Sequence, residues 1–252
     1  MTSEASTVGQ IPILTARPLT IALPKGRTIG PVAALLARAG VIAGDTTETE
    51  TEGAPTRSLA DALSDDSRAL VRKARFGEQA IDLLLLKPDD VPTYVEYGTA
   101  DLGVCGRDVL VEREVDVYQP LDLGLGRCRL VVAGRVGVDM TLAQTGRMPR
   151  VATKYPRTAA AHFARHGVQV EIVNVQSSVE LAPLTGLADV IVDLVETGTT
   201  LVENGLEVKE EILGISSMLI CNRASYKLRL AVVGPLVDAL RDVLSAGLPP
   251  SM

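Results

Sequence analysis

The sequence predicts an α/β protein of two lobes, each with a mostly parallel sheet flanked by helices. The 252 residues are 46% hydrophobic but only 3% aromatic, and they include no tryptophan. The core must therefore consist of Val, Leu, Ile and Ala, as is usual for buried parallel strands covered by helices. Strand-like and helix-like segments alternate along the chain in two sets, which predicts two lobes. A ligand site between two such lobes is expected.

The first set begins at Leu19, after residues 1–18, which are rich in Ser and Thr and are expected to form a disordered tail. A strand at "LTIALP" leads through "KGR" into a helix that is ended by Gly40. Residues 44–64 are acidic and show no sustained period, so a mobile surface insertion is expected there. The later elements of this set are strands over 80–88, 100–106 and 128–134, and helices over 89–98 and 107–114.

The second set begins near Pro149. The apolar patterns predict strands over 150–156, 168–175, 188–195, 207–215 and 216–222, and helices over 157–167 and 178–187. Residues 225–247 carry a helical apolar face, and Pro235 should kink or divide this last helix.

Charge and cysteine content exclude several classes of protein. The net charge is −6, and no basic stripe points to nucleic acid or an anionic membrane as the main partner. Cys105, Cys128 and Cys221 lie far apart in the chain, which favours reduced thiols over a disulfide framework or a zinc knuckle. The N-terminus lacks a secretion signal, and the apolar run over 81–86 is too short to span a bilayer, so a cytoplasmic protein is expected.

The stretch "DLVETGTTL", residues 193–201, carries the most informative chemistry. It follows a buried strand and offers a glycine, hydroxyls and backbone N–H groups at a predicted helix start, where a phosphate can bind. Asp193 and Glu196 could accept hydrogen bonds from two ribose hydroxyls. The alternative is that Thr199 or Thr200 only caps the helix while the acids face solvent.

Other candidate groups are less specific when taken singly. Lys25 and Arg27 lie on the loop after the first strand, where ligands collect in open α/β sheets, although such a loop can simply be solvated. Arg68 could contact a phosphate, as arginine often does, but most arginines are surface residues. Asp108 follows another strand and is either a helix cap or a ligand contact.

His162 and His166 have a spacing that can chelate a metal, but their helix supplies no third ligand, so no metal site is expected in the protein itself. No Walker A, GxGxxG, HExxH or GxSxG sequence occurs.

Taken together and in order, these segments resemble ATP phosphoribosyltransferases. The resemblance runs from about Leu19 to about Leu244 and rests on "LTIALPKGR", "DDSRAL", "ADLGVCGRDVL", "RVATKYP", "DVIVDLVETGTTL" and "SSMLICNRASYK". It implies the short form of the catalytic subunit, with a fold like the type II periplasmic binding proteins. It places residues 19–126 and 222–252 in a discontinuous lobe I and residues 127–221 in lobe II.

The family's reaction joins ATP to phosphoribosyl pyrophosphate (PRPP). Adenine N1 attacks ribose C1 with inversion, and pyrophosphate leaves carrying Mg²⁺. The resemblance assigns the ribose hydroxyls to Asp193 and Glu196, and the 5-phosphate to Thr197, Gly198, Thr199, Thr200 and Leu201. It places Lys25, Arg27 and Arg68 at the polyphosphates, with the two arginines stabilising the leaving pyrophosphate. Asp108 matches a nucleotide-contacting position, and Lys154 and Glu180 would face the same cleft.

The resemblance also implies partners. Short-form subunits depend on a regulatory subunit resembling histidyl-tRNA synthetase, which carries the histidine feedback site and joins them in a hetero-octamer; a homodimer of catalytic subunits is expected within it. Two alternatives remain from the residues alone. One is a two-lobed protein that binds a small anion without catalysis, and the other is a phosphoribosyltransferase for a different base.

Overall fold

The computed structural model describes residues 17–44, 58–64, 69–137 and 148–247. Nearly all of the expected tail, most of the expected insertion and Arg68 lie outside these residues. The chain divides into two compact units. Unit 1 comprises Met1–Cys105, Asp116–Leu123 and Met218–Met252, and unit 2 comprises Gly106–Val115 and Gly124–Ser217.

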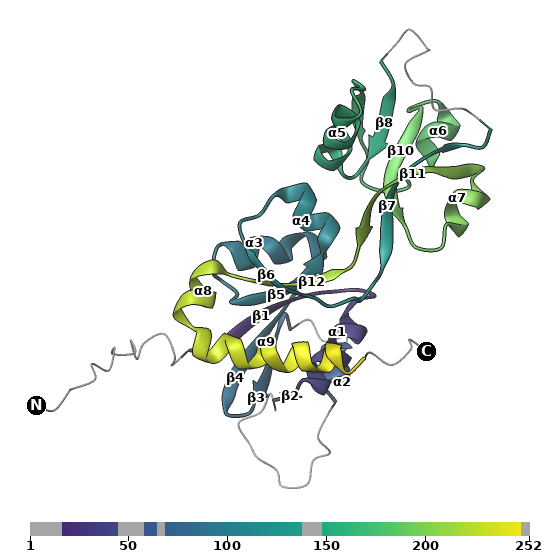
Figure 1. The fold of residues 1–252 in the computed structure, drawn as a ribbon. Coiled ribbons are helices and arrows are strands. Elements are labelled where there is room, and N and C mark those ends of the chain that lie inside the picture. Colours follow the sequence, from purple (N-terminus) through teal and green to yellow (C-terminus); the bar gives the residue numbers. More distant parts are fainter. Residues whose placement is uncertain (1–16, 45–57, 65–68, 138–147, 248–252) are drawn as a thin grey trace, which may run out of the picture. The chain divides into compact units, whose positions relative to one another are not determined.

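Unit 1 contains a seven-stranded sheet with the order β2-β3-β4-β1-β5-β12-β6 (Figure 1). Its strands are β1 (Leu19–Pro24), β2 (Val41–Ala43), β3 (Val71–Phe76), β4 (Gln79–Leu86), β5 (Leu102–Gly106), β6 (Tyr118–Asp122) and β12 (Ser217–Cys221). The central strand β1 pairs in parallel with β4 and β5, whereas β2, β3 and β6 pair with their neighbours in antiparallel fashion. The sheet therefore has more antiparallel pairing than was expected. The expectation of a mostly parallel sheet did not include these three strands.

The helical elements of unit 1 are α1 (Ile29–Arg38), α2 (Leu59–Ser64), η2 (Pro88–Asp90), α3 (Val91–Glu96), α8 (Arg223–Leu228) and α9 (Leu230–Ser245). Helices α1 and α9 contact each other and bury apolar side chains such as Leu36 and Leu240. The last helix is divided at Arg229 and continues through Pro235, so the expected division at the proline is wrong and only the alternative of a kink stays a prediction. None of the described helices is both long and apolar enough to cross a membrane.

Helix α2 corrects part of the expected mobile insertion. Residues 59–64 form a helix that contacts α1 and buries Leu59 and Leu63. Arg72 of β3 is also buried, and its guanidinium donates to the carbonyl oxygens of Ala62 and Ala69. The helix is thus held by two buried leucines and by Arg72 of the sheet, a pattern that its short sequence did not reveal.

A buried carboxylate joins the ends of several elements of unit 1. Asp101, fully buried just before β5, accepts hydrogen bonds from the backbone N–H of Thr20, the Ser225 hydroxyl and the guanidinium groups of Arg17 and Arg229. Arg229 is itself 1% exposed and lies 2.5 Å from the carboxylate. The pair therefore connects the start of β1, the start of β5 and helix α8 without leaving either charge alone in the core.

Unit 2 contains a five-stranded sheet with the order β11-β7-β10-β8-β9. Its strands are β7 (Cys128–Arg135), β8 (Arg150–Thr153), β9 (Glu171–Asn174), β10 (Val190–Val195) and β11 (Leu206–Ile215). Strands β10, β8 and β9 are parallel, and β7 pairs with β10 and β11 in antiparallel fashion. Helix α5 (Pro156–Arg165) packs on one face, and α6 (Leu181–Thr185) and α7 (Thr199–Glu203) pack on the other (Figure 1).

Helix α4 (Arg107–Arg113) belongs to unit 2, although its residues were expected in lobe I. The Glu112 carboxylate accepts hydrogen bonds from the backbone N–H groups of Arg157 and Thr158, in the first turn of α5. One turn earlier, the Asp108 carboxylate accepts a bond from the hydroxyl of Tyr155. Two acids spaced i and i+4 thus hold α4 against α5. The chain also returns to unit 1 at Met218, before the expected position near Cys221.

We predict that Asp101→Asn lowers the free energy of unfolding by about 3–5 kcal/mol, because removing one charge of a buried pair leaves Arg229 without a counter-charge. Urea unfolding followed by circular dichroism would measure this change. The matched control is Asp116→Asn, which breaks the exposed ion pair with Arg223 and should cost no more than about 1 kcal/mol. Equal losses in the two variants would contradict the role given to Asp101.

Candidate functional site

The carboxyl ends of the parallel strands of unit 2 bring three of the predicted site residues together. Val192 of β10 lies opposite Thr153, the last residue of β8. The next residues along the two strands are Asp193 and Lys154. Glu180 follows β9 and begins α6. Because carboxyl ends of parallel strands meet at one edge of a sheet, the register places Asp193 beside Lys154, and the charges of both Lys154 and Glu180 act on Asp193.

A buried hydroxyl fixes this edge. Thr153 is completely buried, and its Oγ1 donates to the carbonyl oxygen of Val192 at 2.7 Å. The Thr153 Oγ1 atom in turn accepts a hydrogen bond from the backbone N–H of Tyr155 at 2.8 Å. The turn that carries Lys154 is thereby held against β10. Sequence reasoning did not single out Thr153, although a hydroxyl at the end of an otherwise apolar strand is a usable signal for such a contact.

Asp193 is the most perturbed acid of this edge. Burial raises the pKa of its carboxyl above the ordinary value, and the charge of Glu180 adds to the rise. A hydrogen bond from the backbone N–H of Leu194, at 2.8 Å, and the charge of Lys154 act in the opposite direction. The sequence left open whether Asp193 contacts a ribose or only faces solvent, and the structure shows a half-buried carboxylate with few donors, which is characteristic of binding sites.

The turn after β10 exposes backbone donors. Gly198 precedes α7 with φ of +85°, a conformation that favours glycine. In the part of the chain that the structure describes, no acceptor is recorded for the backbone N–H groups of Gly198, Thr200 and Leu201. The hydroxyls of Thr197 and Thr199 lie 3.0 Å apart at the same turn. The residue that precedes the helix is a glycine without a side-chain cap, so the interpretation that Thr199 or Thr200 only caps α7 is wrong.

Asp108 and Glu196 lie near one thiol. The pKa of Cys128 is raised by burial and further by the negative charges of Asp108 and Glu196. Asp108 comes from α4 and Glu196 from the turn after β10, so the structure brings the expected nucleotide contact close to the expected ribose contact. The sequence had placed these two residues in different lobes. The contact that the sequence did not reveal is that of Tyr155, whose hydroxyl donates a hydrogen bond to Asp108 at 2.9 Å.

The predicted cations belong to unit 1. Lys25 and Arg27 are exposed on the turn between β1 and α1, on either side of Gly26. The backbone N–H of Lys25 bonds to the carbonyl oxygen of Leu86, which fixes the start of this turn at the carboxyl ends of β1 and β4. Among the described residues no ion pair is recorded for either cation. Arg68 lies outside the described residues.

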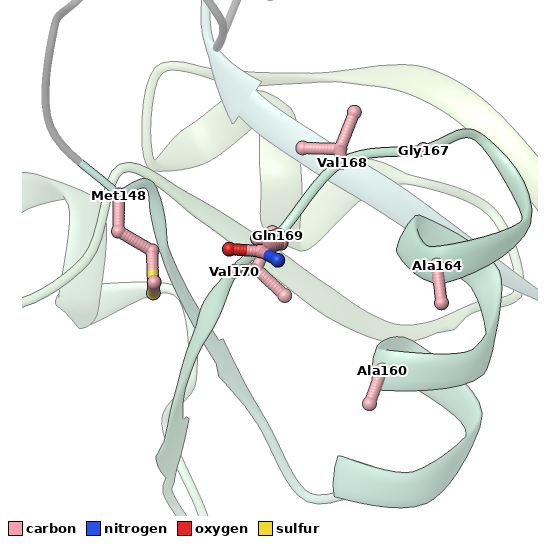
Figure 2. A pocket seen from close by; sticks show the side chains of 7 residues that line it. All are labelled: Met148, Ala160, Ala164, Gly167, Val168, Gln169 and Val170. Atoms are coloured by element: carbon pink, nitrogen blue, oxygen red, sulfur yellow. The ribbon is translucent and has the colours of Figure 1, made fainter.

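A separate pocket of about 540 Å³ lies beside α5 and the segment over 167–170 (Figure 2). Its lining includes Met148, Ala160, Val168 and Val170, and Gln169 is the only polar side chain among the residues that line it. None of the predicted site residues contributes to it. An apolar lining without a charge is unsuited to a phosphate, so this pocket does not compete with the edge around Asp193.

We predict that Asp193→Asn stabilises the protein near neutral pH by about 0.5–2 kcal/mol, the range common for a single stabilising substitution, because it removes a partly desolvated charge. A raised folded-state pKa means that the wild-type carboxyl favours folding below its ordinary pKa and that this contribution is lost as the pH rises through the raised value. The gap between variant and wild type should therefore close on acidification.

Urea midpoints measured from pH 3.5 to 8 would show this trend. Glu196→Gln, at an exposed position, serves as the control and should change stability by no more than about 0.5 kcal/mol. A stability difference between Asp193→Asn and the wild type that stayed constant across this pH range would refute the raised pKa of Asp193.

Comparison with known proteins identifies the family. The family model described as ATP phosphoribosyltransferase (HisG) matches residues 87–242. The chain is 54% identical to the ATP phosphoribosyltransferase of Sorangium cellulosum over 225 residues, which are 89% of this chain and 95% of that protein.

Solved structures agree with this family. The ATP phosphoribosyl transferase (HisG:HisZ) complex from Thermotoga maritima matches with a TM-score of 0.72 at 32% identity, over 90% of this chain and 99% of that chain. The periplasmic aliphatic sulphonate binding protein SsuA from Escherichia coli has a TM-score of 0.53 at 12% identity, over 90% of this chain and 72% of that one. This second likeness concerns the fold alone and confirms the predicted periplasmic-binding-protein-like architecture. The family match and the identity across nearly the whole length of a relative together show that the chain belongs to the ATP phosphoribosyltransferase family.

Proposed function

We propose that this chain is the catalytic subunit of a cytoplasmic ATP phosphoribosyltransferase that joins ATP to PRPP in the first step of histidine biosynthesis. The observation that carries the proposal is the carboxyl edge of unit 2, where a half-buried Asp193 lies shortly before a turn whose backbone donors at Gly198, Thr200 and Leu201 have no acceptor among the described residues. Its test is the direct detection of phosphoribosyl-ATP and pyrophosphate, given below.

The turn over 197–201 binds the 5-phosphate of PRPP in this proposal. Its backbone N–H groups at Gly198, Thr200 and Leu201 have no recorded acceptor within the described residues, and the hydroxyls of Thr197 and Thr199 stand beside them. Successive amides and hydroxyls make a concave donor surface that suits a phosphate group. Neutral donors also match a site that adjoins two acids, because they bind an anion without pairing to those acids.

Asp193 and Glu196 accept hydrogen bonds from the two ribose hydroxyls. A carboxylate that is poorly solvated gains more from a hydroxyl donor than one already bonded to water or to protein. The burial that raises the pKa of Asp193 therefore also prepares it for a diol. Glu196 is exposed and follows the last residue of β10. Asp193 lies within β10, so the two acids can contact a ribose from different positions along the chain.

The leaving group is stabilised by the cations of unit 1. As adenine N1 attacks ribose C1 with inversion, the C1–O bond breaks, and its electron pair stays on the departing pyrophosphate, which carries Mg²⁺ with it. Lys25, Arg27 and Arg68 neutralise that charge, and the two arginines can do so with paired N–H groups. Such a displacement needs charge stabilisation more than proton transfer. No general base among the site residues is required.

The ATP side involves Asp108, Lys154 and Glu180. Lys154 and Glu180 both act on the charge of Asp193, so a nucleotide bound by them would lie next to the ribose. Asp108 is held by Tyr155 and lies near Cys128 together with Glu196. These contacts support a shared site for the two substrates within reach of unit 2.

The partner of the proposed enzyme is a regulatory subunit. The solved relative from Thermotoga maritima is a HisG:HisZ complex. The match with the present chain covers 99% of the matched chain of that complex. We extend this assembly to the present chain, with a homodimer of catalytic subunits inside a hetero-octamer and with histidine feedback through the regulatory subunit.

The expected outcome of mixing the pure chain with ATP, PRPP and Mg²⁺ is slow formation of phosphoribosyl-ATP and pyrophosphate, and faster formation when a histidyl-tRNA-synthetase-like regulatory subunit is added. Mass spectrometry detects both products. Absence of product under both conditions would sink the proposed function. Transfer to another base, but not to ATP, would instead favour a different phosphoribosyltransferase.

In the same assay Arg27→Ala should reduce turnover by about 10²- to 10³-fold, the loss seen when a transition-state donor is removed. The affinity for ATP should change little, because the cation acts on charge that develops at the leaving group. A loss of substrate affinity with unchanged turnover would assign Arg27 to ground-state binding.

A glycine pair tests the phosphate turn. Gly198→Ala puts a side chain at φ of +85°, which costs about 1–2 kcal/mol. The free turn should therefore relax to another conformation, and restoring the binding conformation should weaken PRPP binding by about 5- to 30-fold. Gly205→Ala is the matched control, because Gly205 has a similar φ of +65° after the other end of α7 with open space around it. Calorimetric titration with PRPP should show weaker binding by Gly198→Ala than by Gly205→Ala. Equal affinities in the two variants would indicate that the turn has a purely structural role.

A further inference from the structure

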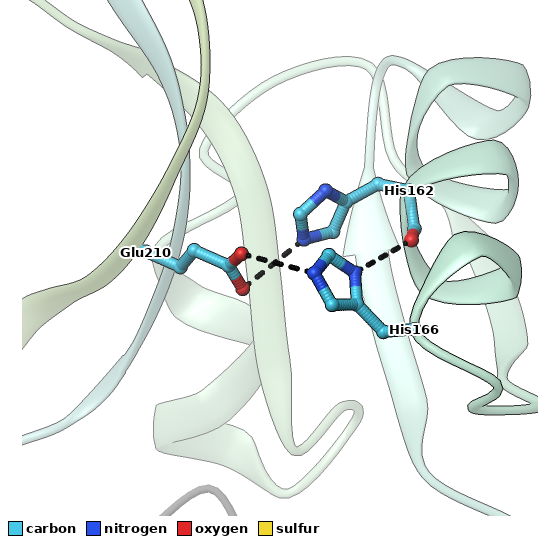
Figure 3. A group of neighbouring side chains, drawn as sticks. All are labelled: His162, His166 and Glu210. Atoms are coloured by element: carbon cyan, nitrogen blue, oxygen red, sulfur yellow. Dashed lines mark hydrogen bonds and ion pairs between the residues drawn. The ribbon is translucent and has the colours of Figure 1, made fainter.

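A second cluster of ligand-type side chains lies in unit 2, on the α5 face of the sheet (Figure 3). His162 and His166, at the end of α5, face Glu210 of β11. His162 Nε2 is 3.2 Å from Glu210 Oε2, and His166 Nε2 is 3.6 Å from Glu210 Oε1. Among the described residues this is the only group of three or more such side chains close enough to share an ion. The proposed reaction uses none of them.

The separations fit a tetrahedral metal site. Nitrogen and oxygen ligands of zinc lie about 2.0–2.2 Å from the ion, and tetrahedral angles then put neighbouring ligand atoms about 3.4 Å apart. The separations of 3.2 and 3.6 Å lie on either side of this value, but they run to the two different oxygens of the Glu210 carboxylate. The carboxylate must therefore rotate for one oxygen to bind an ion beside both nitrogens. All three ligand atoms lie within 4.8 Å of one another. An ion could enter with small side-chain movements and no change of backbone.

A bulge in β11 directs Glu210 towards the histidines. Val208 pairs with Ala133, but Glu210 pairs with Val132, so Lys209 is an extra residue in the ladder. In a regular ladder Lys209 would pair with Val132, and Glu210 would pair with Val131, whose side chain lies on the face of α6 and α7. Val132 lies on the face covered by α5. Because paired residues share a face and bulges redirect side chains, the bulge is what completes the cluster.

The second nitrogen of His166 is already engaged. His166 Nδ1 lies 2.9 Å from the carbonyl oxygen of His162, and this contact requires Nδ1 to donate. The proton on Nδ1 leaves Nε2, which faces Glu210, as the ring nitrogen that can bind an ion. Metal-binding histidines typically donate their other N–H to a backbone carbonyl in this way. The C-terminal end of α5 also favours a positive charge through the helix dipole.

We propose that His162, His166 and Glu210 form a binding site for a divalent transition-metal ion such as Zn²⁺. Two imidazoles and one carboxylate suit zinc, cobalt or nickel and disfavour Mg²⁺ and Ca²⁺, which take oxygen ligands. The three protein ligands leave a fourth position for water. The bound ion connects the end of α5 to β11. This site is independent of the proposed transferase activity, and its failure would leave that activity untouched.

The test is a calorimetric titration of the tag-free full chain with ZnCl₂ alone. The expected result is one saturable site per chain and a higher melting temperature in the presence of Zn²⁺. His166→Ala and Glu210→Gln should each weaken binding by at least about tenfold, since even the loss of an outer-shell partner costs that much. Both residues are substantially exposed, so these variants are expected to fold.

The matched control is Glu211→Gln. It is the same chemical change at the next residue of β11. Glu211 lies on the opposite face of the sheet and forms an ion pair with Arg129. This variant should bind Zn²⁺ as the wild type does. The chain has only two histidines and three cysteines, so the absorption of bound Co²⁺ identifies the ligands. No saturable binding, wild-type affinity in Glu210→Gln, or a thiolate-to-cobalt band would each overturn the proposal.

Discussion

The register of β10 against β8 is the constraint on which the functional edge of unit 2 depends. It sets Val192 opposite Thr153, and the Thr153 hydroxyl bonds to the Val192 carbonyl across the pair. A slip of one residue would turn Asp193 from the face of α6 and α7 to the face of α5. The carboxylate would then lose both Glu180 and Lys154. The chemistry of the turn therefore rests on strand pairing that comes before it in the chain.

Two buried carboxylates show how differently the units use such groups. Asp101 is fully buried, and its oxygens accept bonds from Thr20, Ser225 and two arginines. Asp193 has one backbone donor, and burial raises its pKa. The first group is satisfied by the fold, so it strengthens unit 1. The second is left short of partners, so unit 2 is less stable than it could be but can bind a ligand hydroxyl at that position.

The sequence predicted the features that follow from repeated β-α patterns or from resemblance to a known family. It failed where a few polar contacts determine how an element is attached. The β-α alternation predicted both units, and "DLVETGTTL" predicted the acidic residues and the turn. The three antiparallel strands of unit 1 were missed because β2 is very short and β3 and β6 are polar. Helix α4 was assigned to the wrong unit because its attachment depends on Glu112 and Tyr155. No periodicity encodes such pairs.

Strand β11 is two residues longer than β7, with ten residues against eight. The excess is taken up at the two irregularities of their pairing, one at Lys209 and one between Glu211 and Leu213. Each extra residue has no partner on β7, so its deletion would leave every other pair in place and keep Glu210 on the face of α5. The strand can thus lose length at two positions without losing its pattern, whereas a deletion at a paired residue would exchange the faces of all that follow.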